Sequence, residues 1–151
     1  MIVPLSVTDF AARCGAELHC EIDKLLEVSG LAIDSRQVKP GDLFVAIPGV
    51  KVDGHDYLEA ALERGAGAAL VQQQVSSALP QLIVSDSEAA LQTFGAMTRA
   101  AYDGILVGIT GSAGKTTAKN MLAEILSRAG SVVATKGNQN NELGVPLTLA
   151  D

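Results

Sequence analysis

The sequence predicts an α/β fold, because short apolar runs typical of buried strands alternate with segments that have the apolar spacing of an amphipathic helix. The clearest strands are 68–71 and 82–84, and the clearest helices are 55–64 and 86–102. Glycine, proline or aspartate residues separate most of these segments, as is usual at turns. Strands that alternate with helices in this way indicate a largely parallel sheet.

The first elements are predicted from their caps and turns. Ser6 and Gly15 have the residue types that begin and end helices, so we expect a first helix with an apolar face of Val7, Phe10, Ala11 and Cys14. Two short strands are expected over 31–35 and 42–47, around a turn at 39–41.

The later elements follow from similar signals. Ser85-Asp86-Ser87-Glu88 is expected to cap a helix that runs to about Tyr102. An apolar strand is then expected over 105–109, followed by a glycine-bearing turn and a helix over 118–129. The run 132–134 is expected to be the next strand.

Composition excludes several classes of protein. The chain has 151 residues, 48% of them hydrophobic and 3% aromatic, so its core must consist of aliphatic side chains. The net charge is −6, and no Lys/Arg cluster forms a basic face, which argues against nucleic acid as a partner. Neither a signal peptide nor an apolar run of roughly 20 residues is present, so we expect no membrane insertion. Cys14 and Cys20 have too few possible co-ligands for a zinc site and indicate free thiols in the cytoplasm.

The run from 105 to 117 has the order that a phosphate-binding loop needs: strand, glycine-bearing turn, Lys-Thr-Thr and helix. Glycines let backbone N–H groups converge on phosphate oxygens, the lysine reaches the outer phosphates, and the first threonine is a ligand for Mg²⁺. The alternative is an ordinary strand–turn–helix unit whose glycines only permit the turn. We expect a nucleoside triphosphate to bind at Gly111, Ser112, Ala113, Gly114, Lys115, Thr116 and Thr117, with Thr116 on the metal.

A second group of polar residues and glycines lies at predicted strand ends. Asp34-Ser35-Arg36 follows the strand expected at 31–35, and Gly49 and Asp53-Gly54-His55 follow the strand expected at 42–47. Open α/β sheets bind ligands at such ends, where Ser35 and Arg36 would hold a hydroxyl and a diphosphate. On the residues alone, we favour the simpler interpretation that these are strand-end caps with one surface ion pair.

A third group is rich in carboxamides. Gly137-Asn138-Gln139-Asn140-Asn141 follows the strand expected at 132–134, so a parallel sheet would place it on the same edge as the phosphate loop. Carboxamides donate and accept hydrogen bonds without charge, which suits a sugar, a peptide or phosphate-linked oxygens. The alternative is a turn in which asparagine tolerates left-handed backbone.

Together these segments resemble the Mur ligases, the ATP-dependent amide-forming enzymes of peptidoglycan synthesis. The resemblance rests on Thr-Gly-x-x-Gly-Lys-Thr at 110–116, on Asp-Ser-Arg with Pro-Gly-Asp-Leu-Phe-Val-Ala at 34–46, and on Asp-Gly-His at 53–55. Within the family, the run from 137 to 149 is most similar to members that add D-alanyl-D-alanine to UDP-N-acetylmuramoyl-tripeptide.

The resemblance implies roles for individual residues. Lys115 would be catalytic, and ATP and Mg²⁺ would be the cofactors. The substrate would contact the residues that match the family's pattern, namely Ser35, Arg36, Val50, Lys51, Val52, Asp53, Gly54, His55, Asn138, Asn140 and Asn141. UDP-N-acetylmuramoyl-tripeptide and D-alanyl-D-alanine would be the partners of a monomeric enzyme.

We expect three parts: a UDP-binding α/β domain over 1–84, a connecting helix over 85–103, and the start of a parallel-sheet ATPase domain over 104–151. No apolar run that ends in an acid follows the loop, apart from 147–151, so we expect a truncated enzyme without ligase activity of its own. Two rival functions are a family member that adds the third peptide residue and a non-catalytic module that binds a UDP-sugar.

Overall fold

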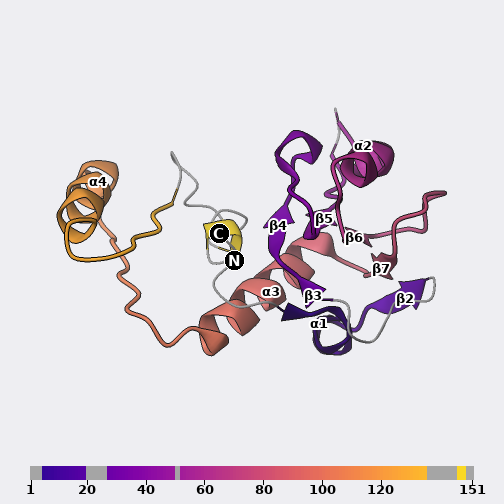
Figure 1. Cartoon of the computed structure of the whole chain (residues 1–151), viewed down its shortest axis with the longest axis horizontal. Coiled ribbons are helices and arrows are strands. Elements are labelled where there is room, and N and C mark those ends of the chain that lie inside the picture. Colours follow the sequence, from indigo (N-terminus) through magenta and orange to yellow (C-terminus); the bar gives the residue numbers. More distant parts are fainter. Residues whose placement is uncertain (1–4, 20–26, 50–51, 136–145, 149–151) are drawn as a thin grey trace.

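The computed structural model describes residues 5–19, 27–49, 52–135 and 146–148. Within these residues, a twisted sheet lies between two layers of helices, and a further helix lies apart from the sheet near the carboxyl end of the chain (Figure 1). The α/β class that the sequence predicts is thereby confirmed.

The described strands form a five-stranded sheet in the order β2-β7-β6-β5-β4 and a two-stranded one, β1 with β3. In the larger sheet, β4 to β7 are parallel neighbours and β2 alone runs antiparallel, against β7. The bounds of the strands are β1 Leu5–Ser6, β2 Glu17–His19, β3 Glu27–Val28, β4 Gly30–Ala32, β5 Asp42–Val45, β6 Ala68–Val71 and β7 Gln81–Ile83.

Two apolar clusters cover the two faces of this sheet. On one face, α1 (Val7–Cys14) and α3 (Ser87–Ala101) pack through Phe10 and Phe94, whose rings meet edge to face with centroids 5.3 Å apart. On the other face, α2 (Leu58–Glu63) packs through Leu58 and Ala61. Alternate residues of β5 and β6 face the two clusters, so both central strands are buried throughout.

The predicted helices have the predicted caps. The Ser6 hydroxyl accepts a hydrogen bond from the N–H of Asp9, and Gly15 ends α1 in the left-handed conformation. The Asp86 carboxylate accepts from the N–H groups of Glu88 and Ala89 at the start of α3. The helix expected over 55–64 begins as the 3₁₀ turn η2 (Gly54–Tyr57), and α4 (Lys115–Leu126) begins three residues earlier than predicted.

The strands expected over 31–35 and 42–47 are present but shorter, and their pairing is parallel. The connection between them carries the 3₁₀ turn η1 (Ser35–Gln37) as well as the predicted turn at Pro40-Gly41. A parallel pair needs this crossover, because the second strand must begin at the same end of the sheet as the first.

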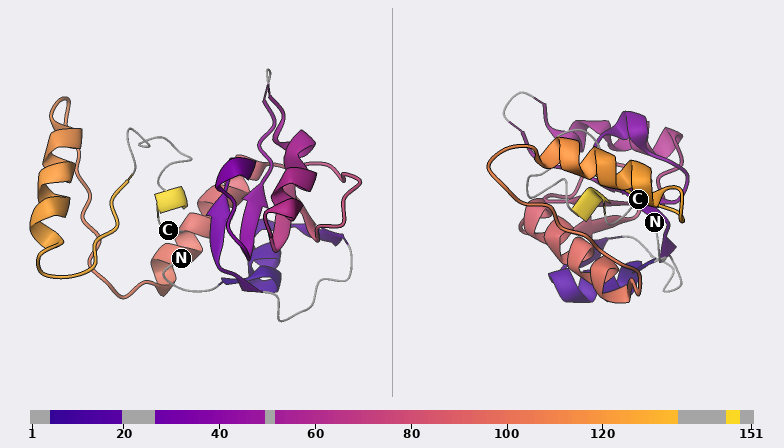
Figure 2. Two further views of the ribbon diagram at one scale, coloured as in Figure 1. Left: turned by 45° about the horizontal axis from the view of Figure 1, so that its top comes forward. Right: turned by 90° about the vertical axis from the view of Figure 1, so that its left-hand side faces the viewer.

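The strands predicted at 105–109 and 132–134 are wrong for this structure, which shows irregular backbone at both places. The side chains of Ile105, Leu106 and Val107 are 52–90% exposed. A strand is defined by hydrogen bonds to a neighbour, and every described strand belongs to the two N-terminal sheets. The apolar runs at 105–109 and 132–134 therefore pair with no described strand. The helix predicted after the first run does form, as α4 (Figure 2).

A search of the described residues finds no helix with the length and apolar character needed to cross a membrane.

Candidate functional site

The carboxyl ends of β4, β5 and β6 meet at one edge of the sheet, because these strands are parallel neighbours. The segments that leave this edge are η1 after β4, the turn before η2 after β5, and Gln72 after β6. Ligands of open α/β sheets bind at such an edge. The topology thus brings together the described members of the second sequence group.

After β4, Asp34 organises the backbone that follows it. Its carboxylate accepts hydrogen bonds from the Arg36 N–H at 3.0 Å and from the Arg36 guanidinium at 2.9 Å and 2.7 Å. The Arg36 hydrogen bonds and charge lower the pKa of Asp34 to about 2. Ser35 is buried beside this pair, whereas the Arg36 side chain is 83% exposed. The cap and the surface ion pair match the simpler sequence interpretation.

After β5, the turn at Asp53-Gly54-His55 is bound to two strand ends. The Asp53 carboxylate accepts from the His55 N–H at 2.9 Å and lies 2.6 Å from His55 Nδ1. These contacts lower the pKa of Asp53. His55 Nε2 accepts from the N–H of Gln72, directly after β6, at 2.9 Å. His55 is therefore a buried link between the turn and the neighbouring strand.

Glycine is required at two places here, at Gly49 before the turn and at Gly54 within it. A Cβ on Gly54 would lie 2.6 Å from the Ile47 nitrogen and 2.9 Å from the Ala46 Cα, and a Cβ on Gly49 would lie 2.4 Å from the Val52 carbonyl oxygen. The Gly54 N–H also donates to the Ile47 carbonyl at 3.0 Å. The turn therefore lies directly against the end of β5, with the Val52 side chain 61% exposed.

Sequence reasoning missed two supports of this edge. The Ser87 hydroxyl at the start of α3 donates to the Ala46 carbonyl at 3.0 Å and is fully buried. The N–H of Gln72 supports His55 from β6. Both contacts join residues far apart in the chain and involve a backbone group, so no local motif reveals them.

The phosphate loop has the backbone geometry that its glycines predict. Gly111 has φ 149° and Gly114 has φ 77°, and Gly114 is the N-cap of α4. Among the described residues beyond its chain neighbours and the backbone of α4, no heavy atom would lie within 4 Å of a Cβ on Gly114, so this side of the helix start is open there. The Lys115 ammonium group donates to the Gly111 carbonyl oxygen and lies over the loop.

Thr116 is in the first turn of α4, and its hydroxyl oxygen is a hard ligand of the kind that Mg²⁺ takes together with phosphate oxygens and water. The described residues contain no cluster of three or more His, Cys, Asp or Glu side chains that would hold a metal by themselves. The donor set therefore fits a metal bound together with nucleotide phosphates.

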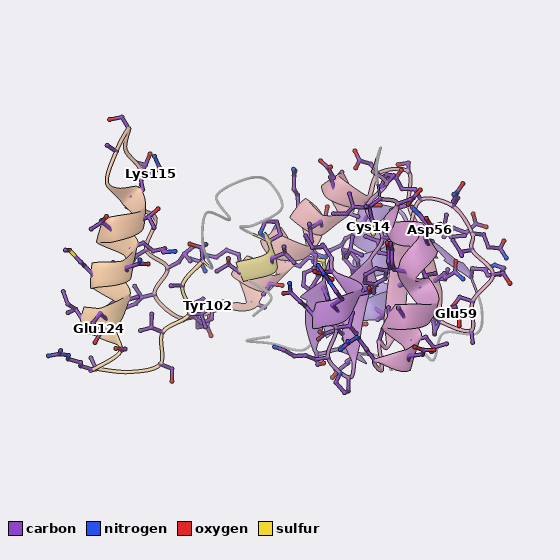
Figure 3. The ribbon with its side chains drawn as sticks, turned by 90° about the horizontal axis from the view of Figure 1, so that it is seen from above. Cys14, Asp56, Glu59, Tyr102, Lys115 and Glu124 are labelled. Carbon is purple, nitrogen blue, oxygen red and sulfur yellow. The ribbon has the colours of Figure 1, made fainter. Side chains whose placement is uncertain are left out.

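The phosphate loop and the polar residues at the carboxyl edge of the sheet lie at different ends of the described structure. Figure 3 shows Lys115 at one end and Asp56 and Glu59, on η2 and α2, at the other. Val50, Lys51, Asn138, Asn140 and Asn141 lie outside the described residues, as does Asp151. The proximity of the carboxamides to the phosphate loop thus stays a prediction.

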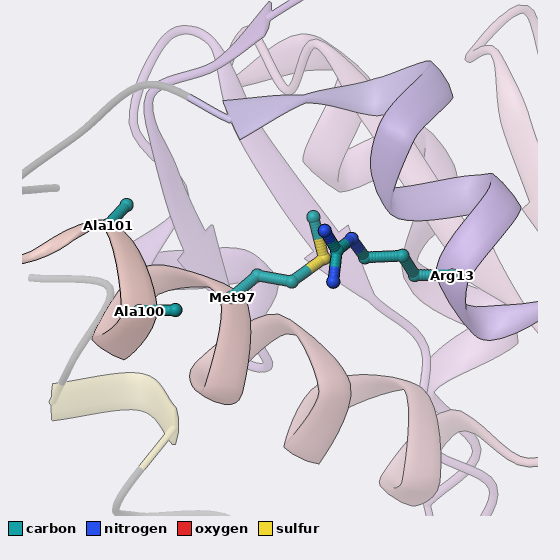
Figure 4. Close-up of a pocket in the computed structure, with 4 residues that line it drawn as sticks. All are labelled: Arg13, Met97, Ala100 and Ala101. Atoms are coloured by element: carbon teal, nitrogen blue, oxygen red, sulfur yellow. The ribbon is translucent and has the colours of Figure 1, made fainter.

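A cavity of about 240 Å³ lies elsewhere, between α1 and the last turns of α3, lined by Arg13, Met97, Ala100 and Ala101 (Figure 4). Met97, Ala100 and Ala101 are at the opposite end of α3 from Ser87, which lies at the carboxyl edge of the sheet. The lining offers one cation and otherwise apolar groups, so it does not match a nucleotide.

An open, mainly parallel sheet and a glycine-bearing loop at a helix start are features of α/β proteins that bind phosphate groups. The catalytic-domain model of the Mur ligase family matches residues 27–129, and the Mur ligase middle-domain model matches 109–151. The chain belongs to the Mur ligase family, whose members are ATP-dependent ligases.

Two relatives illustrate the similarity. The UDP-N-acetylmuramoyl-tripeptide–D-alanyl-D-alanine ligase of Escherichia coli (strain K12) is 43% identical over 82% of this chain. The UDP-N-acetylmuramoyl-L-alanyl-D-glutamate–2,6-diaminopimelate ligase of Listeria monocytogenes is 37% identical, also over 82% of the chain. The matches cover 27% and 26% of those two proteins, so the chain spans about a quarter of their length.

Solved structures agree with this assignment. A MurF crystal structure from Acinetobacter baumannii superimposes with a TM-score of 0.83 and 33% identity, covering 99% of this chain and 33% of that one. The MurF ligase of Thermotoga maritima in complex with ADP has a TM-score of 0.69 and 35% identity, covering 86% of this chain and 30% of that one.

Proposed function

We propose that this chain supplies the UDP-binding domain and the phosphate loop of an ATP-dependent ligase that adds D-alanyl-D-alanine to UDP-N-acetylmuramoyl-tripeptide. The observation that carries the proposal is the 43% identity to the Escherichia coli ligase of that name, over 82% of this chain. The similarity to MurF structures over nearly the whole chain supports it.

The proposed reaction has two steps. A carboxylate oxygen of the tripeptide attacks the γ-phosphorus of ATP, which forms an acyl phosphate and releases ADP. The amine of D-alanyl-D-alanine then attacks the acyl carbon, the carbon–oxygen bond to phosphate breaks, and the amine loses a proton. Because phosphate is a far better leaving group than oxide, the first step makes the second possible.

In this proposal, the residues of the phosphate loop stabilise negative charge. Backbone N–H groups of 111–117 and the start of α4 would bind the phosphates. Lys115 would leave the Gly111 carbonyl and neutralise the transferred phosphoryl group. Mg²⁺, held by Thr116 and the phosphates, would supply charge neutralisation at the same oxygens.

The uridine-diphosphate end of the substrate is assigned to the carboxyl edge of the sheet. Ser35 and the turn that contains Asp53 and Gly54 lie on adjoining strand ends there. Arg36 is assigned to the diphosphate, and its guanidinium would have to exchange part of its ion pair with Asp34 for the phosphate oxygens. Asn138, Asn140 and Asn141 are assigned to the substrate near the reacting carboxylate.

The proposal keeps the division expected from the sequence, with a substrate domain over 1–84, a connecting helix over 85–103 and part of an ATPase domain from 104 onward. The ligase in this proposal is a monomer and acts in the cytoplasm. The 151-residue chain by itself is expected to lack ligase activity.

A second candidate is the ligase that adds the third peptide residue, because the Listeria monocytogenes relative of that function is 37% identical over the same share of the chain. The two functions differ in both substrates. One uses the tripeptide precursor and D-alanyl-D-alanine, and the other uses the dipeptide precursor and 2,6-diaminopimelate.

The test is an assay of phosphate release and amide formation by the complete ligase that contains this sequence. Each precursor is offered with each amine in the presence of Mg-ATP. The proposal predicts one phosphate per amide formed, with the tripeptide and D-alanyl-D-alanine pair alone. Turnover with the dipeptide and 2,6-diaminopimelate would establish the second candidate instead.

A further inference from the structure

We propose that His55 is a positioning residue that holds the Asp53-Gly54 turn at the carboxyl edge of the sheet in the conformation that binds uridine diphosphate. The inference rests on the proposed function, and it gives His55 a different part from the direct substrate contact that the family resemblance implies.

Both ring nitrogens of His55 are engaged within the protein. Nδ1 lies 2.6 Å from an Asp53 carboxylate oxygen, and Nε2 accepts the Gln72 N–H at 2.9 Å. The residue is 6% exposed. A ligand at the edge would therefore find neither nitrogen available, unlike the hydroxyl or backbone groups of the neighbouring residues.

These partners fix the tautomer of the ring. The Asp53 carboxylate only accepts hydrogen bonds when ionised, so the proton is on Nδ1. The Gln72 N–H only donates, so Nε2 is unprotonated. His55 thus acts as a neutral link that donates on one side and accepts on the other.

The link joins the turn that follows β5 to the end of β6, the parallel neighbour of β5. Gly54 is held against β5 by its hydrogen bond to Ile47 and by the absence of a Cβ. His55 ties the same turn to β6 through Gln72, seventeen residues away. With both contacts formed, Val52 and the Asp53 side chain face solvent, and they are 61% and 39% exposed.

A turn held in its binding conformation before the ligand arrives loses less freedom on binding, and the affinity rises accordingly. Removing the link should therefore weaken ligand binding even in a variant that remains folded. This effect distinguishes a positioning role of His55 from a purely structural role. A purely structural role would change the stability of the protein but leave the UDP affinity of the folded protein unchanged.

Three substitutions separate the two hydrogen bonds. His55→Ala removes both. His55→Gln places a carbonyl oxygen near the position of Nε2 and keeps an acceptor for Gln72. His55→Asn places an amide N–H near Nδ1 and keeps a donor for Asp53. The control is His19→Gln, since His19 is the other histidine of the chain and lies on β2, where its Nε2 is 2.7 Å from Gln74 Nε2, so this variant removes a histidine contact outside the Asp53-Gly54 turn.

The experiment titrates UDP into the 151-residue chain and each variant by calorimetry, with the folded fraction of each measured by circular dichroism. The ¹⁵N spectrum of the imidazoles reports the tautomer. We expect His55→Ala to bind UDP about tenfold more weakly, the loss expected from one or two positioning hydrogen bonds. His55→Gln and His55→Asn should each recover part of the affinity, and His19→Gln should match the wild type.

Equal UDP affinity in the wild type and in folded His55→Ala would overturn the inference alone. If His55→Ala does not fold, the UDP affinities of His55→Gln and His55→Asn are compared with that of the wild type instead. Wild-type affinity in both variants would overturn the inference. A ¹⁵N spectrum with the proton on Nε2 contradicts the proposed link directly. Failure of the wild type itself to bind UDP overturns the proposed function, and the inference with it.

Discussion

The Lys115 ammonium group lies against the Gly111 carbonyl oxygen, so the side chain already spans the loop to which phosphate is proposed to bind. Its neighbours Gly111 and Gly114 have left-handed backbone that favours glycine. The loop residues are mostly exposed, so Lys115 contributes little to the core. Its removal should thus affect nucleotide binding far more than folding.

Lys115→Ala is expected to weaken Mg-ATP binding by about tenfold to a hundredfold, the range for loss of one hydrogen bond to a charged group. In the complete ligase, it should abolish ATP-dependent turnover. Titration calorimetry measures the affinity, and a thermal melt checks the fold. Lys119→Ala, one turn along α4, is the control, and unchanged ATP affinity in Lys115→Ala would contradict the phosphate-loop assignment.

The lowered pKa of Asp34 makes the stability of the fold depend on pH. Its pKa is lowered from 3.8 to about 2 in the folded chain by Arg36, so the unfolded chain binds the proton more tightly. The stabilisation is present above pH 4 and is lost as the pH falls from about 4 to about 2. Because the pair lies at the surface, we expect less than about 1 kcal/mol.

Asp34→Asn should therefore remove part of the acid sensitivity of folding. Urea melts of the wild type and of Asp34→Asn at pH 5 and pH 2.5 measure it, with the two proteins converging at the lower pH. A constant difference between them at both pH values would show that the ion pair is not the cause.

Residues at the carboxyl edge show the limits of sequence reasoning. The caps at Asp34 and Asp53 and the Arg36 ion pair follow from local residue types and are confirmed. The link from His55 to Gln72 could not be predicted, because it depends on which strand lies beside β5.

Among the elements, the helices were predicted well because their signals are local. The cap of α3 illustrates this: Asp86 and the apolar spacing of 87–101 lie in one short stretch of sequence. The strands at 105–109 and 132–134 were predicted from apolar runs alone, and no described neighbour pairs with either. An apolar run in the sequence indicates that a segment is buried. Whether that segment forms a strand depends on hydrogen bonds to a neighbouring segment, which lies elsewhere in the sequence.

Asp86→Ala should lower the free energy of unfolding by about 1 kcal/mol, since the N-terminal N–H groups of α3 lose their acceptor. Chemical denaturation measures the change. Ser85→Ala, the exposed neighbour, is the matched control. Equal stability of the two variants would mean that the cap does not stabilise α3.

Across the whole molecule, α1 and α3 are joined to the sheet by a core in which Phe10 and Phe94 are fully buried. Among the described residues, this core has no counterpart around α4, which has no buried residue. Folding of the described chain is therefore expected to depend on the N-terminal unit. The sequence predicted that unit, although it could not predict that α1 and α3 share one face of the sheet.

Phe94→Ala should destabilise this unit by about 3–5 kcal/mol, because it leaves a cavity against Phe10. Gln92→Ala, on the exposed face of the same helix, should change stability by less than about 0.5 kcal/mol. Urea denaturation followed by circular dichroism compares them. A similar, small effect in both would contradict the assignment of the core.

The most direct test of the central claim is a calorimetric titration of this chain with UDP-N-acetylmuramoyl-tripeptide, alongside UDP alone and Mg-ATP. The account predicts saturable binding of the UDP-linked ligand and of UDP, because the described strand ends that form the carboxyl edge of the sheet all belong to the N-terminal unit. Binding of Mg-ATP without any binding of either uridine ligand would contradict the account and leave a phosphate-loop protein with a different substrate.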